Sequence, residues 1–459
     1  MILHKIKSEG LAQLSYLLGS GSEAVVIDPR RDVDVYIDLA HDEGMTITHI
    51  FETHRNEDFI IGSRELAELT GAEIHHHEAT DWGYGSTVTE DDSFSIGQLR
   101  LEILHTPGHT FDGISIVLYD TEFSDEDAVA VFSGDALFIG DVGRTDFFPE
   151  QREEVAGLLY ESIFNKLLPL GDEVLLYPAH GAGSVCGDSM ADREFSTLGY
   201  ERRHNRVLQM TDRDEFVQFK ATEFHHMPGY FEQIHTSNQK GPELLRDAIG
   251  ETPRPMTAME VNAFRQDGGL VIDLRGAEAF GGAHIPGSLN IAFPMLTAYI
   301  GYGVDYDTPL ALIVSNRAMF EEAWMQLQRI NYMNVVGWLG GGMEEWAVSA
   351  LHFESIPQIF VEEIKRRYDQ GEEFLLLDVR KNGEFERGSL QGAQHIFVGE
   401  LQDRLDEIGD TRPIVTFCGT GYRASNAASI LKRNGFEQVE NFLGSMRACM
   451  QTECPLDLD

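Results

Sequence analysis

The sequence predicts a three-domain α/β protein, and three observations support this prediction. Short apolar runs that fit buried strands alternate with amphipathic helical patterns along the chain. A proline-bearing segment at residues 251–257 interrupts the alternation and fits a linker. Beyond this linker one sequence pattern occurs twice. We therefore expect domains at residues 1–250, 253–352 and 357–459.

The first domain places polar segments after its predicted strands. Strands are expected at residues 24–28, 47–51, 99–105, 113–119, 128–133 and 174–178, and helices near 33–43, 63–69 and 149–168. Histidines or aspartates follow several of these strands directly. Because layered α/β folds build their sites at the ends of strands, we expect a site where these segments meet.

The second and third domains are copies of one another. Residues 270–291 match residues 375–396 at a constant offset of 105, so that Asp273 pairs with Asp378 and Arg275 with Arg380. Residues 335–341 match residues 439–445 at an offset of 104. A period this long indicates a duplicated domain, and its alternating pattern predicts a doubly wound parallel sheet in each copy. A second linker is expected at residues 352–357.

Composition excludes several classes of function. The net charge of −41 at pH 7 argues against nucleic acid and anionic membranes, which attract basic surfaces. No apolar run is long enough to span a membrane, and the N-terminus lacks a signal-peptide core. Four cysteines are too few for a disulfide framework, so a reducing, cytoplasmic compartment is expected, and Cys449 and Cys454 are expected to be incidental.

Four polar segments in the first domain carry the chemistry. They contain His54 with Asp58, His109, Asp135 and His180, each shortly after a strand. In this order they resemble the metal-ligand series of the metallo-β-lactamase superfamily over most of residues 1–250. The resemblance implies an αββα sandwich with a metal at the strand ends.

This chain departs from the usual first motif of that superfamily, Thr-His-x-His-x-Asp-His. Asn56 replaces the second histidine and Phe59 the last. A dinuclear zinc hydrolase needs both imidazoles. His54, His109 and Asp135 remain, and two imidazoles with one carboxylate form the facial triad of non-haem Fe(II) oxygenases. We therefore expect one Fe(II) per chain, with Asp58 and His180 orienting the ligands.

Within the superfamily the sequence is similar to the persulfide dioxygenases. The segment Gly143–Phe147 looks like their signature, and the resemblance places Arg144 at the substrate pocket, where it could hold a carboxylate. The alternative for Arg144 is a structural ion pair with Asp146 or with another neighbour. Cys186 is either a small buried residue or a thiol near the metal. His75, His76 and His77 follow a strand run and are expected on a solvated surface.

The third domain contains a cysteine loop between a strand and a helix. Residues 414–417 lead into Cys418-Gly419-Thr420-Gly421-Tyr422-Arg423, and an alanine-rich helix follows. This loop resembles the active loop of rhodaneses. Backbone N–H groups and the helix N-terminus would surround the sulfur and stabilise a thiolate or persulfide, and Arg423 could hold a sulfur oxyanion.

Two exclusions follow from the same loops. A phosphatase loop has five residues between Cys and Arg, whereas this chain has four, which leaves too small a cradle for phosphate. The second domain has Ser315-Asn316-Arg317 at the corresponding place, and residues 187–417 contain no cysteine. It therefore cannot carry a persulfide, and we expect it to pack against other domains or shape a channel.

Together these features predict an enzyme of sulfur metabolism. The first domain would oxidise a small-molecule persulfide with O2 to sulfite, and Cys418 would pass sulfane sulfur to sulfite, giving thiosulfate. The alternatives are a zinc thioester hydrolase of the glyoxalase II type, and a sulfur-relay carrier whose first domain is not catalytic. The resemblance also implies a homo-oligomer.

Overall fold

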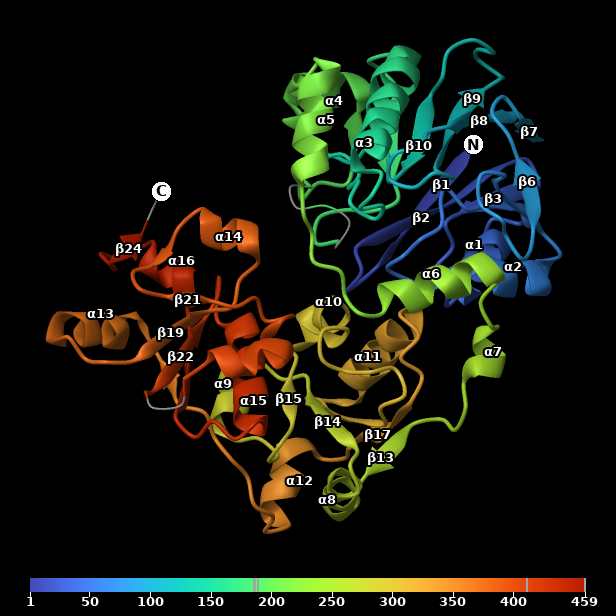
Figure 1. The fold of residues 1–459 in the computed structure, drawn as a ribbon. Helices are drawn as coiled ribbons and strands as arrows, with labels where there is room; N and C mark the ends of the chain where they lie inside the picture. Colours follow the sequence, from blue (N-terminus) through green and yellow to red (C-terminus); the bar gives the residue numbers. More distant parts are fainter. Residues whose placement is uncertain (185–186, 188–189, 410–411, 458–459) are drawn as a thin grey trace. The chain divides into compact units, whose positions relative to one another are not determined.

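The structure of the protein, a computed structural model, describes residues 1–184, 187, 190–409 and 412–457. The chain divides into two compact units (Figure 1). One unit comprises Met1–Ile249 with the short segment Gln328–Asn331, and the other comprises Gly250–Leu327 with Tyr332–Asp459. The second unit therefore holds both copies of the duplicated domain. No helix among the described residues has the length and apolarity needed to cross a membrane.

The first unit is a four-layer αββα sandwich, as expected. Its two sheets have six strands each, in the orders β1-β2-β3-β4-β5-β6 and β12-β11-β10-β9-β8-β7. The strands of the first sheet are β1 (Ile2–Ser8), β2 (Gln13–Ser20), β3 (Glu23–Ile27), β4 (Thr46–Phe51), β5 (Glu73–His77) and β6 (Ser86–Val88). Those of the second are β7 (Ser93–Ile96), β8 (Leu99–His105), β9 (Ile114–Asp120), β10 (Ala130–Gly134), β11 (Leu175–Pro178) and β12 (Ser196–Thr197).

Three apolar layers hold this sandwich together. The central layer joins the facing sides of the two sheets and includes Phe51, Leu101 and Phe132. The strand β8 alternates buried and partly exposed residues, as a strand with one face in a core should. Helices α1 (Asp34–Asp42) and α2 (Ser63–Thr70) cover the first sheet, and α3 (Arg152–Glu161), α4 (Leu198–His204) and α5 (Arg213–Thr222) cover the second.

The last part of the first unit is helical and was not expected in detail. After the π-helical turn Ser162–Leu167 and the short helix Leu168–Leu170, the chain adds α6 (Phe231–Lys240) and α7 (Leu245–Ala248). The predicted helix at 149–168 is therefore two segments of different winding. No strong hydrophobic period marks residues 223–249, and this explains why the sequence did not reveal α6.

The prediction of a solvated surface for His75, His76 and His77 is wrong. All three are buried, because β5 lies inside the first sheet between β4 and β6. Their rings stack on other rings: His75 on Phe51 with centroids 5.0 Å apart, and His77 on His105 at 3.8 Å. Burial lowers the pKa of His75 and of His77 to about 4, so both are neutral.

Each half of the second unit has a five-stranded parallel sheet with the same strand order. The orders are β13-β17-β16-β14-β15 and β18-β23-β22-β19-β21. The first half contains β13 (Arg254–Met256), β14 (Leu270–Asp273), β15 (Leu289–Asn290), β16 (Leu310–Ile313), β17 (Val335–Leu339), α8 (Ala258–Gln266), α9 (Ala277–Gly282), α10 (Leu296–Ile300), α11 (Arg317–Arg329) and α12 (Gly342–Val348). The second contains β18 (Gln358–Ile359), β19 (Leu375–Asp378), β20 (Ser389–Leu390), β21 (Gln394–His395), β22 (Ile414–Phe417), β23 (Val439–Phe442), β24 (Leu456–Asp457), α13 (Val361–Gln370), α14 (Asn382–Glu386), α15 (Tyr422–Arg433) and α16 (Ser445–Cys449).

Two sequence expectations change in this unit. The linker at residues 251–257 is shorter than expected, because Arg254–Met256 pair with β17 as an edge strand, a position that tolerates proline. Cys449 and Cys454 are not incidental, because the structure joins them in a disulfide.

Candidate functional site

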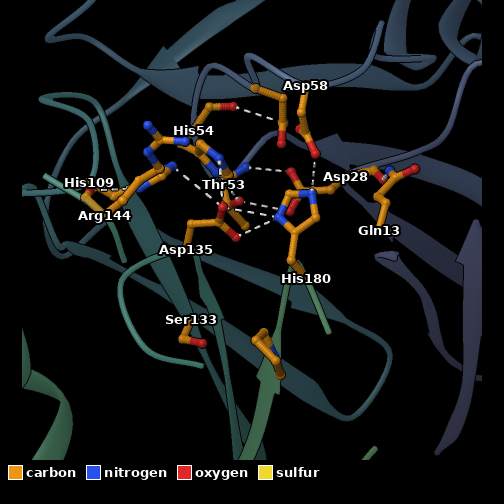
Figure 2. A network of polar contacts seen from close by, with 12 residues as sticks. Gln13, Asp28, Thr53, His54, Asp58, His109, Ser133, Asp135, Arg144 and His180 are labelled. Carbon is orange, nitrogen blue, oxygen red and sulfur yellow. Dashed lines mark hydrogen bonds and ion pairs between the residues drawn. The ribbon is translucent and has the colours of Figure 1, made fainter. Parts of the chain in front are cut away.

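The candidate metal site lies where the strands of the two sheets of the first unit end. His54 follows β4, His109 follows β8, Asp135 follows β10 and His180 follows β11, and Figure 2 shows these side chains pointing toward one another. Gly134, directly before Asp135, has a φ of +52°, and a Cβ there would lie 2.9 Å from the side chain of Thr53. Glycine therefore allows the turn that aims Asp135 into the site.

Three side chains converge closely enough to share one ion. The Nε2 atoms of His54 and His109 lie 3.7 and 3.4 Å from Oδ2 of Asp135, and the potential ligand atoms all lie within 4.8 Å of one another. All three residues are buried, with at most 3% of their surface exposed. The structure thus brings together the two imidazoles and the carboxylate that the sequence singled out.

The protonation states of His109 and Asp135 suit a metal. Nδ1 of His109 is 3.0 Å from the carbonyl oxygen of Arg144 and donates to it, which leaves Nε2 as a lone-pair atom. This Nε2 is buried and has no hydrogen-bond partner. Burial lowers the pKa of His109 to about 3. Burial alone would raise the pKa of Asp135, but the neighbouring histidines hold it well below its usual range. Neutral imidazoles and an ionised carboxylate are the forms that ligate.

His180 and Asp58 extend this cluster away from the triad. Nδ1 of His180 is 2.8 Å from Oδ1 of Asp135, and its Nε2 is 3.1 Å from Oδ2 of Asp58. Burial would lower the pKa of His180, yet Asp135 and Asp58 on either side raise it well above its usual value. A cationic His180 would hold the Asp135 carboxylate in place rather than bind a metal.

The two substituted positions supply no further imidazole. Asn56 Nδ2 donates to the carbonyl oxygen of His54 at 3.2 Å. Phe59 is fully buried, with its ring centroid 6.0 Å from that of His180. The donor set on these residues is therefore two histidines and one aspartate, which fits a mononuclear Fe(II) centre with open positions.

The cysteine loop forms a separate candidate site in the second unit. Cys418 follows β22 and is buried, and the amide of Gly421 points to its Sγ at 3.1 Å. Gly421 has a φ of +112° at the start of α15, a conformation that glycine adopts without strain. The Cys418 amide donates to Ser445 Oγ at 3.1 Å, which fixes the base of the loop. Such a loop can stabilise negative charge on sulfur.

The other loop residues have distinct surroundings. The carbonyl oxygens of Gly419 and Thr420 accept from the amides of Arg447 and Gly444, and Tyr422 is 42% exposed. Arg423, expected to hold an oxyanion, forms a two-point ion pair with Glu384, with Nη2 2.7 Å from Oε1. Part of its guanidinium is therefore already engaged.

Comparison with known proteins agrees with this geometry. The metallo-beta-lactamase superfamily profile matches residues 9–180, and the rhodanese-like domain profile matches residues 257–349 and 360–452. The persulfide dioxygenase ETHE1 of Bos taurus, a mitochondrial protein, is 33% identical over 222 residues, which cover 44% of this chain and 74% of that protein. The chain belongs to the persulfide dioxygenase family. In this member the metallo-β-lactamase fold is fused to two rhodanese-like domains.

Two further proteins are similar to this chain. A solved structure titled as a metallo-beta-lactamase from Staphylococcus aureus superposes with a TM-score of 0.65 at 32% identity, covering 74% of this chain and 98% of that chain. The putative sulfur carrier protein YrkF of Bacillus subtilis is 35% identical over 99 residues, which cover 22% of this chain and 54% of that protein.

Arg144 is fully buried and paired. Its Nε and Nη2 donate to the Asp146 carboxylate at 2.6 and 2.8 Å, and Nη2 also reaches the carbonyl oxygen of His225 at 3.0 Å. Of the two roles weighed for Arg144, the geometry shows the ion pair with Asp146. Since its backbone carbonyl accepts from His109, Arg144 supports the ligand rather than presenting a free guanidinium. Cys186 lies outside the described residues.

Sequence reasoning missed two residues that fix the first ligand loop. Asp28 has a φ of +49° and accepts from the amide and hydroxyl of Thr53, at 2.8 and 2.7 Å. Thr53 Oγ1 in turn lies 3.0 Å from Nδ1 of His54. Asn238, on α6, donates to the carbonyl oxygens of Asn56 and Phe59 and accepts from the Ile61 amide. Asp28 directly follows a strand, a signal that was available, whereas nothing in the sequence linked Asn238 to residues 56–61.

Replacing Asn238 should loosen this loop. Asn238→Ala leaves three buried backbone groups without partners, and we expect a loss of about 2 kcal/mol or more in the free energy of unfolding. A bound metal should also leave faster, because this loop directly follows His54. Urea unfolding and metal-release kinetics measure both effects. Gln239→Ala on the same helix, which loses an exposed hydrogen bond to Asp81, is the control and should change neither. Equal behaviour of the two variants would contradict this role.

Proposed function

We propose that this chain oxidises a low-molecular-weight persulfide with O2 in its first domain and transfers sulfane sulfur in its last. Family membership supports persulfide oxidation and sulfur transfer in general terms. The observation that carries the finer proposal is the His54, His109 and Asp135 triad, with Asn56 and Phe59 in place of the imidazoles that a second metal would need. The oxidation balances as RSSH + O2 + H2O giving RSH and sulfurous acid, which ionises to sulfite.

The residues of the first domain have separate tasks in this proposal. His54, His109 and Asp135 would hold the iron, and bound Fe(II) supplies the means to activate O2 toward the substrate sulfur. The Arg144 carbonyl fixes the tautomer of His109, and His180 fixes the Asp135 carboxylate.

The last domain would use the sulfite. Cys418 attacks the outer sulfur of a persulfide, the S–S bond of that persulfide breaks, and the free thiol leaves with a proton. Sulfite then attacks the outer sulfur on Cys418, forming thiosulfate and returning the thiolate. The Gly421 amide would stabilise the sulfur anion in both steps. The last domain would thus consume the sulfite that the first domain makes. Joining both domains in one chain raises the effective concentration of sulfite near Cys418.

Metal content separates this proposal from a zinc thioester hydrolase. Protein purified without added metal should contain close to one iron per chain and little zinc. Two zincs per chain, with thioester hydrolysis and no oxygen uptake, would overturn the proposal. A sulfur-relay carrier, the other alternative, would transfer sulfur through Cys418 but consume no oxygen with a persulfide.

Restoring the missing imidazoles should change the metal preference. The double variant Asn56→His with Phe59→His adds two nitrogen donors beside Asp58 and His180, and zinc content should rise toward two per chain while iron falls. Metal analysis after growth in equal zinc and iron measures this shift. The matched double variant Asn56→Gln with Phe59→Leu disturbs the same positions without a new ligand and should bind no extra zinc. An unchanged metal ratio in the histidine variant would count against the assignment.

A further inference from the structure

A second group of potential metal ligands lies in the first sheet of the first unit. His49 on β4 and Glu73 and His75 on β5 each offer one ligand atom, and these atoms all lie within 4.8 Å of one another. The group shares no residue with the triad of the candidate metal site. It is therefore a candidate for a separate ion.

The pairing of β4 with β5 explains why these side chains meet. The two strands run parallel, and His49 lies opposite Glu73 while Phe51 lies opposite His75. Side chains two positions apart on a strand point to the same face, so Glu73 and His75 share the face on which His49 lies beside them. Both strands have a neighbour on each side, β3 and β6, which fixes their spacing. The sheet itself therefore holds the three ligand groups together.

The two imidazoles are close enough to bind one ion. Nδ1 of His49 lies 2.9 Å from Nε2 of His75, and without an ion one ring donates to the other. Two nitrogens bound at about 2.0 Å to a tetrahedral zinc ion lie about 3.3 Å apart, so a small rotation of one ring would suffice. The donor ring would also move its proton to its other nitrogen. Burial lowers the pKa of both histidines, which keeps both rings in the neutral form that ligates metals.

The surroundings pack this group on one side and open it on the other. The ring of His75 stacks on Phe51 with centroids 5.0 Å apart and lies 4.7 Å from the Phe94 ring, and only 3% of His75 is exposed. Ser86, on β6, donates to Oε1 of Glu73 at 2.8 Å and so orients the carboxylate. Glu73 itself is exposed, so an ion can enter from the solvent.

We propose that His49, Glu73 and His75 form a second metal site that binds an exchangeable zinc ion. Imidazole nitrogens with a carboxylate suit zinc, whereas magnesium and calcium prefer oxygen ligands throughout. Three protein ligands leave a fourth position for water. Because one ligand is exposed, the ion would leave during purification and has to be added back. Bound zinc would link β4 to β5 near the start of the loop that carries His54.

Zinc titration of the untagged, iron-loaded protein tests this site. Isothermal titration calorimetry should show one added zinc ion bound per chain, while the iron content of the same sample stays constant. His49→Gln removes a nitrogen ligand at a half-buried position, and zinc affinity should fall by at least about 100-fold. Glu73→Gln changes an exposed side chain, so that folding is not at risk, and it should also weaken zinc binding.

His41→Gln is the matched control. His41 is exposed in the last turn of α1 and belongs to neither group of ligands, so this variant should bind zinc as the wild type does. Since zinc would bind only the folded state, it should raise the Tm of the wild type and of His41→Gln but not that of His49→Gln.

Three results would overturn the second site. They are no zinc bound by the iron-loaded wild type, equal zinc affinity in His49→Gln and the wild type, and release of iron in step with zinc uptake, which would place the zinc at the triad. None of these measurements depends on oxygen uptake or sulfur transfer, so the second site and the proposed function are tested separately.

Discussion

His54→Ala, His109→Ala and Asp135→Ala should each abolish oxygen uptake with a persulfide. Each change removes one of the three side chains whose ligand atoms converge within 4.8 Å of one another at this site. Replacing a group that merely orients a ligand typically costs 10–100-fold in affinity or activity. Removing a ligand itself should lower oxygen uptake by more than about 100-fold. Because iron content should fall in parallel, oxygen uptake is to be compared per bound iron.

His204→Ala is the matched control for this experiment. His204 lies at the end of α4 and is exposed, so its loss should leave iron content and oxygen uptake unchanged. A triad variant that retains one iron per chain and normal oxygen uptake would contradict the metal assignment. Circular dichroism should show native secondary structure in all variants, since the triad side chains provide no part of the apolar layers.

Cys418→Ser should separate the two chemistries. A hydroxyl cannot hold a sulfane sulfur, so we expect sulfur transfer to fall by at least about 1,000-fold. Oxygen uptake should barely change, because Cys418 belongs to a different unit from the triad and a small persulfide can reach the iron without it. The product should therefore shift from thiosulfate toward free sulfite. Simultaneous assays of oxygen, sulfite and thiosulfate measure this shift.

The same variant has two informative failures. If oxygen uptake collapses with sulfur transfer, sulfur must load onto Cys418 before it reaches the iron, and the two reactions are coupled by more than product diffusion. If thiosulfate forms at the wild-type rate, Cys418 is not the sulfur carrier, and Cys186 becomes the residue to replace next.

The sequence revealed the ligands because each follows a strand at a recognisable spacing. His54, His109 and Asp135 stand after β4, β8 and β10, and the topology of a layered α/β fold brings such strand ends together. The duplicated domain was equally visible, since equivalent residues recur at a constant offset. Local patterns and repeats therefore predicted the fold class and the residues that converge.

What the sequence did not reveal depends on contacts between distant segments. The burial of His75 follows from the place of β5 inside its sheet, which a short polar run does not disclose. Asn238 supports a loop about 180 positions earlier in the chain, and Glu384 pairs with the guanidinium of Arg423, which lies 39 positions later. The hydrogen bonds between Asn290 and α15 likewise could not be predicted without knowing which faces meet.

Oxygen consumption by the iron-loaded Cys418→Ser variant, titrated with a small-molecule persulfide, tests the central claim most directly. Because sulfur transfer consumes no sulfite in this variant, we expect one O2 taken up and one sulfite released for each persulfide. Chelation of the iron should stop both. Persulfide turnover without oxygen uptake, or hydrolysis of a thioester by a two-zinc form in its place, would contradict it.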